Sequence, residues 1–187
     1  MLKWLILFFL AQKLKIIEVD SLDLLENTQN WSRFDTFTSM FCCLGSRVKY
    51  GKELFRKVDY TYVHYGALIA KQNGIPHFGL ISSTGADKKS ILLYSRTKGE
   101  IEETLKGIKF PALSIFRPGL LIDRDNDKRW GEVILKYIPL IPKIEAKDMA
   151  RAMMREAELI MERKNIEKTV EVNIYDNCQI KSLLKEK

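Results

Sequence analysis

The chain has 187 residues, of which 46% are hydrophobic and 29% charged, and its formal net charge is +7. This is the composition of an ordinary soluble globular chain with one core of substantial size. Three cysteines and two histidines show no metal-ligand spacing, which argues against a metal site. We expect buried, reduced thiols in a reducing compartment and structural roles for His64 and His77.

The excess positive charge is confined to residues 41–136. A phosphate-rich ligand, a nucleic acid and solvated surface lysines are three explanations that remain open. No basic stripe interleaved with aromatic residues is present, so the pattern does not favour nucleic-acid binding.

The first apolar segment, Leu2–Ala11, is too short to span a bilayer as a helix. We rank a buried strand or helix first, a membrane-facing segment second and a signal peptide last. Ile16–Asp20 has the pattern of a short strand, and Ser21 is placed to begin a helix whose apolar side carries leucines.

From residue 38 onward, short apolar runs alternate with amphipathic stretches. Strands are predicted over Thr38–Leu44, His77–Ser83, Leu113–Phe116 and Thr169–Tyr175. Helices are predicted over Phe55–Gln72, Tyr94–Lys106 and Ala146–Arg163. The methionine stripe of the last helix, which includes Met149, Met153, Met154 and Met161, is interpreted as core.

This alternation predicts an α/β fold with a doubly wound parallel sheet covered on both faces. In such sheets ligands bind beyond the carboxyl ends of the strands. Gly45, Ser83 and Pro118 each follow a predicted strand. We therefore expect them at one rim.

Tyr94 and Lys98 lie four residues apart at the start of a predicted helix, directly downstream of a strand that ends in Ser82 and Ser83. On a helix the ammonium would lie one turn from the phenol and would stabilise its ionised form. A serine hydroxyl could polarise a carbonyl at the same point, which suits carbonyl–alcohol interconversion with a nicotinamide. A surface Tyr–Lys pair beside a serine-rich turn is the structural alternative.

A set of motifs resembles the short-chain dehydrogenase/reductase superfamily, in its atypical branch of Tat-interacting, tumour-suppressor oxidoreductases. The resemblance runs from about Ile16 to about Tyr175. The motifs are Phe41-Cys42-Cys43-Leu44-Gly45, Val58-Asp59-Tyr60, His77 to Lys88 with its Ser-Ser-x-Gly-Ala-Asp-Lys run, Leu93-Tyr94 to Glu100, and Phe116-Arg117-Pro118-Gly119.

The resemblance implies Tyr94 as general acid/base and Lys98 as its electrostatic partner and ribose ligand. Ser83 matches the substrate-polarising serine best, with Ser82 as a close competitor. The implied cofactor is NADP(H). Its implied contacts are Leu44 and Gly45 on the adenine side, Gly119 to Leu121 near the nicotinamide, and Arg129 at the phosphates.

The chain departs from this pattern at its front. The superfamily opens with a strand and a glycine-rich turn that cradles the pyrophosphate, but here the first glycine is Gly45. We therefore expect a Rossmann-like sheet incomplete at its N-terminal strand–helix unit, as in a chain shortened at its front. Residues 1–40 form a divergent segment and residues 41–187 the remainder of one NAD(P)-binding domain, and cofactor binding is left open.

Two functions follow from the resemblance. The first is an NADPH-dependent oxidoreductase of unknown substrate that uses Ser83, Tyr94 and Lys98. The second is a non-catalytic scaffold that binds protein partners in transcription, nuclear import, endosomal trafficking or apoptosis. The expected location is the cytoplasm, with the nucleus or nuclear envelope as an alternative, and no transmembrane span is predicted.

Overall fold

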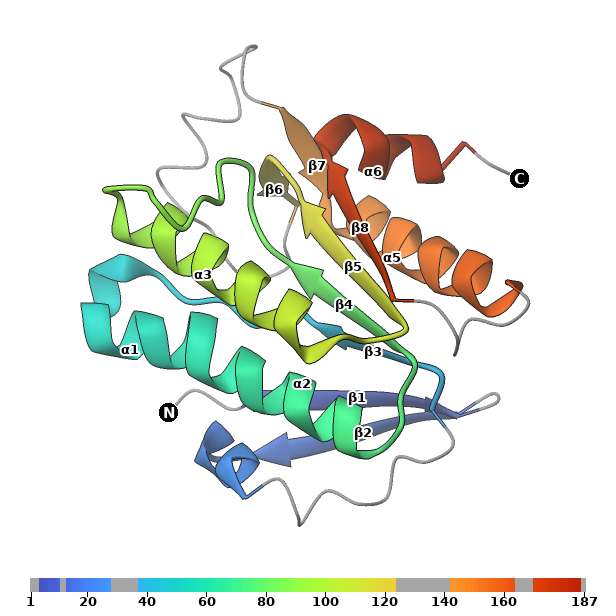
Figure 1. Cartoon of the computed structure of the whole chain (residues 1–187), viewed down its shortest axis with the longest axis horizontal. Helices are drawn as coiled ribbons and strands as arrows, with labels where there is room; N and C mark the ends of the chain where they lie inside the picture. Colours follow the sequence, from blue (N-terminus) through green and yellow to red (C-terminus); the bar gives the residue numbers. More distant parts are fainter. Residues whose placement is uncertain (1–3, 11–12, 28–36, 124–141, 164–169, 186–187) are drawn as a thin grey trace.

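The structure, a computed structural model, describes residues 4–10, 13–27, 37–123, 142–163 and 170–185. Its centre is a four-stranded sheet in which every neighbouring pair is parallel, in the order β3-β4-β5-β8 (Figure 1). These strands are β3 (Ser39–Cys42), β4 (His77–Ile81), β5 (Ala112–Arg117) and β8 (Glu171–Asp176). All four coincide with strands predicted from the apolar runs, to within a few residues at each end.

Helices cover both faces of this sheet, which confirms the predicted doubly wound α/β fold (Figure 1). On one face lie a helix in three parts and a second long helix: α1 (Lys52–Arg56), the π-helical η4 (Lys57–Tyr62), α2 (Val63–Gln72) and α3 (Leu93–Ile108). On the other face lie α5 (Ala146–Met161) and α6 (Asn177–Leu183).

The sides of the sheet follow from strand alternation. Phe78 and Leu80 of β4 pack with Leu113 and Ile115 of β5 under α2 and α3. Phe116 points the other way and packs against α5 and α6. β3, β4 and β5 therefore contribute to two cores, which explains the continuous apolar sequences of β4 and β5, whereas Val172 and Ile174 of the edge strand β8 remain more than a third exposed.

The N-terminal residues form a separate two-stranded antiparallel sheet of β1 (Trp4–Leu10) and β2 (Lys13–Val19). The strand predicted over Ile16–Asp20 is confirmed by β2, and Leu2–Ala11, for which a strand and a helix were both left open, contains the strand β1. Ser21 caps the short 3-10 helix η1 (Leu22–Glu26), and its hydroxyl accepts a 3.1 Å hydrogen bond from Asp23 N–H. Leu22 and Leu25 pack on the three-part helix, so η1 joins this segment to the main fold.

Several elements were not predicted, because they are short. They are η3 (Val48–Tyr50), helix α6, and the parallel pair β6 (Leu120–Ile122) and β7 (Lys143–Glu145). Among the described residues, no helix is both long enough and apolar enough to cross a membrane.

Two predictions about burial need correction. Met149 and Met153 are core residues as predicted, but Met154 and Met161 are more than half exposed because they lie on the solvent side of α5. Cys42 is a buried free thiol, whereas Cys43 and Cys178 are exposed free thiols. Cys43 differs from Cys42 because adjacent residues of an extended segment point to opposite sides.

Gly99 allows α3 to approach the loop that follows β4. A Cβ atom at Gly99 would lie 2.2 Å from Lys88 N and 2.4 Å from Asp87 C, both backbone atoms. We expect Gly99→Ala to lower the free energy of unfolding by about 1–3 kcal/mol, the usual cost of overpacking. Urea unfolding measures this change.

Gly107→Ala is the matched control, because it lies in the same helix with nothing within 4 Å of its Cβ position. Its expected effect has the opposite sign, a stabilisation of about 0.5–1 kcal/mol from helix propensity. Equal effects at the two glycines would contradict the close packing of α3 on the loop.

Candidate functional site

The predicted site residues follow the carboxyl ends of β3, β4 and β5, where loops from neighbouring strands are joined by backbone hydrogen bonds. Ser82 N–H donates to Phe116 O at 2.7 Å, and Thr84 N–H donates to Pro118 O at 3.0 Å. Asp87 N–H donates to Ser95 O at 3.0 Å and so connects the same loop to the start of α3. The prediction that these segments share one rim of the sheet agrees with this topology.

The two serines after β4 have different surroundings. The Ser82 hydroxyl donates a 2.5 Å hydrogen bond to the buried carboxylate of Glu102, which also accepts from Arg117 Nε at 3.0 Å. The Ser83 hydroxyl is buried, with 8% of the residue exposed, and has no hydrogen-bond partner within the described part of the chain. A buried polar atom without a partner is costly and calls for an explanation, so Ser83 is the better candidate to meet a substrate oxygen.

Tyr94 lies in the first turn of α3, as predicted, and is 41% exposed. Its ring lies 5.7 Å from the ring of buried Phe55 on α1, measured between centroids. One side of the Tyr94 ring therefore lies against the protein while the side chain stays accessible. This is a suitable placement for a group that exchanges a proton with a ligand.

Lys98 lies one turn further along α3 and is almost completely buried, with 4% of the residue exposed. Its Nζ makes an ion pair with Asp59 Oδ1 at 2.8 Å, but the angles of this contact are not those of a hydrogen bond. The other carboxylate oxygen of Asp59 accepts a 2.7 Å hydrogen bond from Ser46 N–H in the loop after β3. Burial raises the pKa of Asp59 above its ordinary value, and Lys98 opposes that shift.

Besides Tyr94 and Lys98, the described residues predicted to contact the cofactor lie after β3 and after β5. Leu44 and Gly45 follow β3; Leu44 packs against two apolar clusters, and a Cβ at Gly45 would lie 3.8 Å from Asp59 Oδ1. Gly119 N–H donates to Asn177 Oδ1 at 3.0 Å, and Leu121 lies in β6. Arg129 lies outside the described residues.

Three polar residues of this region, Asp59, Glu102 and Asn177, were assigned no role from the sequence. All three are buried, with exposures of 1%, 1% and 6%. Asp59 could have been found, because it occupies the apolar stripe of its helix between Phe55 and Val63 at a spacing of four residues. A charged residue on a buried stripe indicates a partner elsewhere in the fold.

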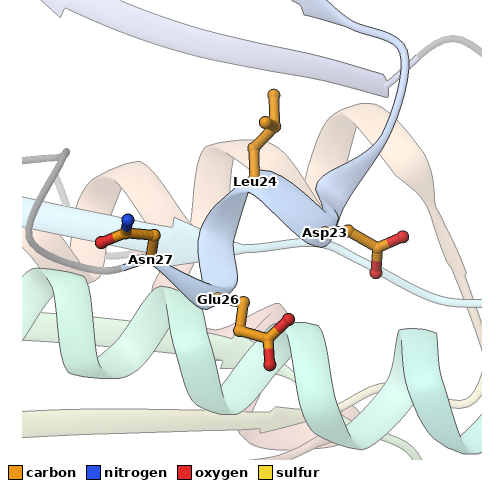
Figure 2. Close-up of a pocket in the computed structure, with 4 residues that line it drawn as sticks. All are labelled: Asp23, Leu24, Glu26 and Asn27. Carbon is orange, nitrogen blue, oxygen red and sulfur yellow. The ribbon is translucent and has the colours of Figure 1, made fainter.

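A surface pocket lies at η1, outside the loops described above, and is lined by Asp23, Leu24, Glu26 and Asn27. In Figure 2 these side chains leave the short helix in different directions and do not converge. Asp23 is already engaged by Lys57 at 2.6 Å and by the Tyr62 hydroxyl at 2.7 Å. The pocket therefore carries no functional assignment.

No protein-family model matches the chain. Among curated proteins, the chain is 48% identical over 93 residues to Protein HTATIP2 of Rattus norvegicus. The aligned segment covers 49% of this chain and 38% of that protein. The chain is 35% identical over 117 residues to the mitochondrial Protein FMP52 of Lodderomyces elongisporus, covering 57% and 49%. The chain thus spans less than half the length of these relatives. The resemblance predicted from the sequence is confirmed.

Solved structures that resemble the chain include MoeE5 and UDP-sugar 4-epimerases. MoeE5 in complex with UDP-glucose and NAD superposes with a TM-score of 0.61 at 10% identity, covering 81% of this chain and 60% of that one. UDP-glucose 4-epimerase with UDP-glucose from Thermotoga maritima superposes with a TM-score of 0.57 at 13% identity, covering 86% and 65%. At this identity the likeness establishes the Rossmann-like fold alone.

Proposed function

We propose that this chain carries the proton-transfer residues of an NADPH-dependent oxidoreductase site. The proposal starts from its resemblance, in sequence and in fold, to the short-chain dehydrogenase/reductase proteins. Tyr94 is the general acid/base, Lys98 its electrostatic partner and Ser83 the group that polarises a substrate carbonyl. The observation that carries the proposal is the buried Ser83 hydroxyl, which lacks a partner in the described structure beside a serine whose hydroxyl is fully engaged.

The nicotinamide end of a dinucleotide fits the residues present better than the pyrophosphate end does. Ser83, Tyr94 and Lys98 supply a free hydroxyl, an accessible phenol and a buried ammonium at one rim. The chain has no glycine before Gly45, so its 187 residues contain no glycine-rich turn ahead of the first strand of the parallel sheet to cradle the phosphates. The preference for NADPH rests on the family resemblance, and a dinucleotide of this class is also supported by the NAD in MoeE5.

The chemistry that a nicotinamide would supply, if bound at this rim, is hydride transfer to a substrate carbonyl carbon. The residues of this chain manage the oxygen. The Ser83 hydroxyl donates a hydrogen bond to the carbonyl oxygen, and the Tyr94 phenol gives its proton to that oxygen as it becomes a hydroxyl. The ammonium of Lys98, one helical turn further along α3, would stabilise the phenolate that remains.

The direct test is calorimetric titration of the purified chain with NADPH, with NADH titrated alongside. We expect binding with NADPH preferred. Lys98→Ala should weaken binding, because Lys98 is proposed to contact the ribose. A chain with a cooperative unfolding transition that binds neither nucleotide would contradict the cofactor part of the proposal.

Tyr94→Phe tests the proton-transfer role. The substitution removes only the hydroxyl and keeps the ring against Phe55, so NADPH affinity should stay within about twofold. Turnover on a panel of carbonyl substrates should fall about 10²–10⁴-fold, the usual contribution of a general acid. Undiminished turnover in Tyr94→Phe would remove Tyr94 from the mechanism.

A second function, a non-catalytic scaffold that binds protein partners, is favoured by the absence of a glycine-rich turn from this sequence. Under this proposal the partners belong to transcription, nuclear import or endosomal trafficking, as the resemblance implies, and the location is cytoplasmic or nuclear. The FMP52 relatives carry the word mitochondrial in their names, which makes that organelle a competing location. Microscopy of the tagged chain distinguishes these compartments, and protein capture by a folded chain that binds no nucleotide would favour the scaffold.

A further inference from the structure

We infer that one end of the helical layer of α1 and α3 binds anionic lipid surfaces. The contact surface, which we name the apolar tip, consists of four exposed side chains: Tyr50, Leu54, Ile91 and Leu92. The first two belong to η3 and α1, and the other two directly precede α3. No residue assigned to proton transfer belongs to the apolar tip, so lipid binding is independent of the proposed function.

The four side chains of the apolar tip are exposed to an extent that is high for apolar residues. Ile91 is 91% exposed, Leu92 65%, Tyr50 58% and Leu54 46%. Single apolar side chains on a surface are ordinary, but a group of them surrounded by polar residues marks an interaction site. Contact with lipid would remove these side chains from water, which is the driving force of binding at a membrane interface.

The two segments that carry the apolar tip adjoin in space, although they are distant in sequence. The ring of Phe55 on α1 lies 5.7 Å from the ring of Tyr94 in the first turn of α3. Glu100 of α3 is contacted by Arg56 of α1 at 2.7 Å and by Arg96 at 3.9 Å. Figure 1 shows the start of α1 and the start of α3 next to each other at the left of the molecule. The apolar tip therefore belongs to one end of the fold.

Hydrogen bonds hold the loop that presents Ile91 and Leu92. Ser90 N–H donates to Asp87 O at 3.0 Å, and Leu92 N–H donates to Ser90 Oγ at 3.2 Å. Arg96 Nη1 donates to Ser90 O at 3.2 Å and joins the loop to α3. Because the backbone is held in this way, the apolar pair does not have to be ordered on binding, which lowers the entropic cost of association.

Positive charge surrounds the apolar tip and indicates the chemistry of its partner. Residues 47–56 and 87–96 together contain seven basic and two acidic side chains, an excess that accounts for most of the formal net charge of +7. Three of the basic side chains are paired with glutamates of α3. Two others, Lys52 and Lys89, are exposed. Exposed apolar side chains beside cations match a surface of anionic headgroups over acyl chains.

The test is co-sedimentation of the full chain with two kinds of vesicle, one of phosphatidylcholine alone and one with about 30% phosphatidylserine. We expect binding to the anionic vesicles to be about tenfold tighter or more, because their headgroups attract the cations. Equal binding to both kinds of vesicle would overturn the inference, and so would a folded chain that does not bind the anionic vesicles.

Ile91→Ser combined with Leu92→Ser tests the apolar tip. Serine is favoured at the N-cap position of α3 that Leu92 occupies, so this variant should keep its fold. Its affinity for the anionic vesicles should fall about tenfold or more, because it lacks the side chains that enter the lipid. Unchanged affinity would place the lipid contact elsewhere in the chain, for example in Leu2–Ala11, and would contradict the assignment.

Met154→Ser combined with Met161→Ser is the matched control. These two side chains are 58% and 57% exposed, but they lie on α5, which covers the other face of the sheet (Figure 1). This variant should bind the anionic vesicles as tightly as the unaltered chain does. A loss equal to that of the Ile91 and Leu92 variant would show that any exposed apolar pair contributes, which rules out a defined contact surface.

Lys52→Gln combined with Lys89→Gln tests the cations around the apolar tip. Affinity for the anionic vesicles should fall about tenfold, because two charges near the headgroups are removed. Lys147→Gln combined with Lys181→Gln removes the same charge from α5 and α6 on the other face of the sheet, and its effect should be smaller. Equal effects of the two variants would mean that only the total charge matters, against a contact at this end.

The same variants separate the other occupants of this surface. If the Lys52 and Lys89 variant loses affinity while the Ile91 and Leu92 variant does not, the surface binds an anion without lipid insertion, and the lipid assignment is wrong. It is also wrong if the unaltered chain is a dimer in sedimentation velocity and the Ile91 and Leu92 variant a monomer, because a second copy then covers the tip. None of these outcomes uses NADPH, so they are decided whether or not the proposed function fails.

Discussion

Glu102→Ala is expected to destabilise the fold by about 3 kcal/mol, because it removes the acceptor of a buried polar cluster. Glu102 is 1% exposed and accepts hydrogen bonds from Ser82 Oγ at 2.5 Å, Arg117 Nε at 3.0 Å and Arg117 Nη2 at 2.5 Å. Removing one partner of a buried ion pair costs about 3–5 kcal/mol. The lower end applies here, since the Arg117 side chain is 31% exposed and water can hydrate it.

Glu103→Ala is the control for this prediction. Glu103 is the adjacent residue of α3, is 44% exposed and contacts Lys106 and Lys88 at the surface, at 2.7 and 3.3 Å. Exposed pairs contribute about 0–1 kcal/mol, so its loss should be small. The free energy of unfolding from urea titration distinguishes the two variants, and a difference below about 1 kcal/mol would show that the Glu102 cluster is not important for stability.

The second large effect is a loss of stability in acid that comes from His77. Its ring is fully buried between two hydroxyls, with Nδ1 3.0 Å from Ser39 Oγ and Nε2 3.1 Å from Ser114 Oγ. Ser114 Oγ in turn donates to the buried carboxylate of Glu156 at 3.0 Å. Burial lowers the pKa of His77 to about 4, and the positive charge of Arg163 adds to this shift.

Proton linkage gives the direction in which the free energy of unfolding changes with pH. In the unfolded chain His77 has its ordinary pKa of about 6.5 and takes up a proton at a pH where the folded chain does not. The full stability contributed by the neutral ring is therefore present above pH 6.5 and is lost as the pH falls toward 4. The shift corresponds to about 3 kcal/mol.

The measurement is the free energy of unfolding between pH 7 and pH 4, for the unaltered chain and for His77→Gln. Carboxylates contribute to acid sensitivity in both, so the difference between the two curves isolates His77. The gap between the curves should narrow by about 3 kcal/mol as the pH falls. Parallel curves would show that His77 accepts a proton equally well in the folded chain.

Much of the fold could be predicted because the central strands β4 and β5 are buried on both faces and the long helices have a single apolar stripe. These patterns are local, so they indicated the four parallel strands and the long helices to within a few residues. The local pattern could not give the pairing of the strands. A strand was predicted over Ile16–Asp20 and a strand or helix over Leu2–Ala11, but nothing in the sequence indicated that β1 and β2 pair with each other outside the main sheet.

The candidate site was predicted only in part, because local patterns place some of its residues and contacts distant in sequence place the others. Tyr94 and Lys98 are related by helical spacing, which is a property of consecutive residues. The choice between Ser82 and Ser83 depended on Glu102, twenty residues further along the chain. Asp59 reaches Lys98 because β3 and β4 are neighbours in the sheet and the π-helical turn directs its carboxylate inward.

The sequence by itself therefore determined the α/β class, the rim at the carboxyl ends of the strands and the spacing of phenol and ammonium, since each depends on periodicity along the chain. Only the tertiary structure decided which of the two serines after β4 has a hydroxyl without a partner, and that Asp59 is the acid paired with Lys98. Both depend on contacts between residues that are distant in sequence, formed in the interior, where a buried polar group either finds a partner or, like the Ser83 hydroxyl, is left without one.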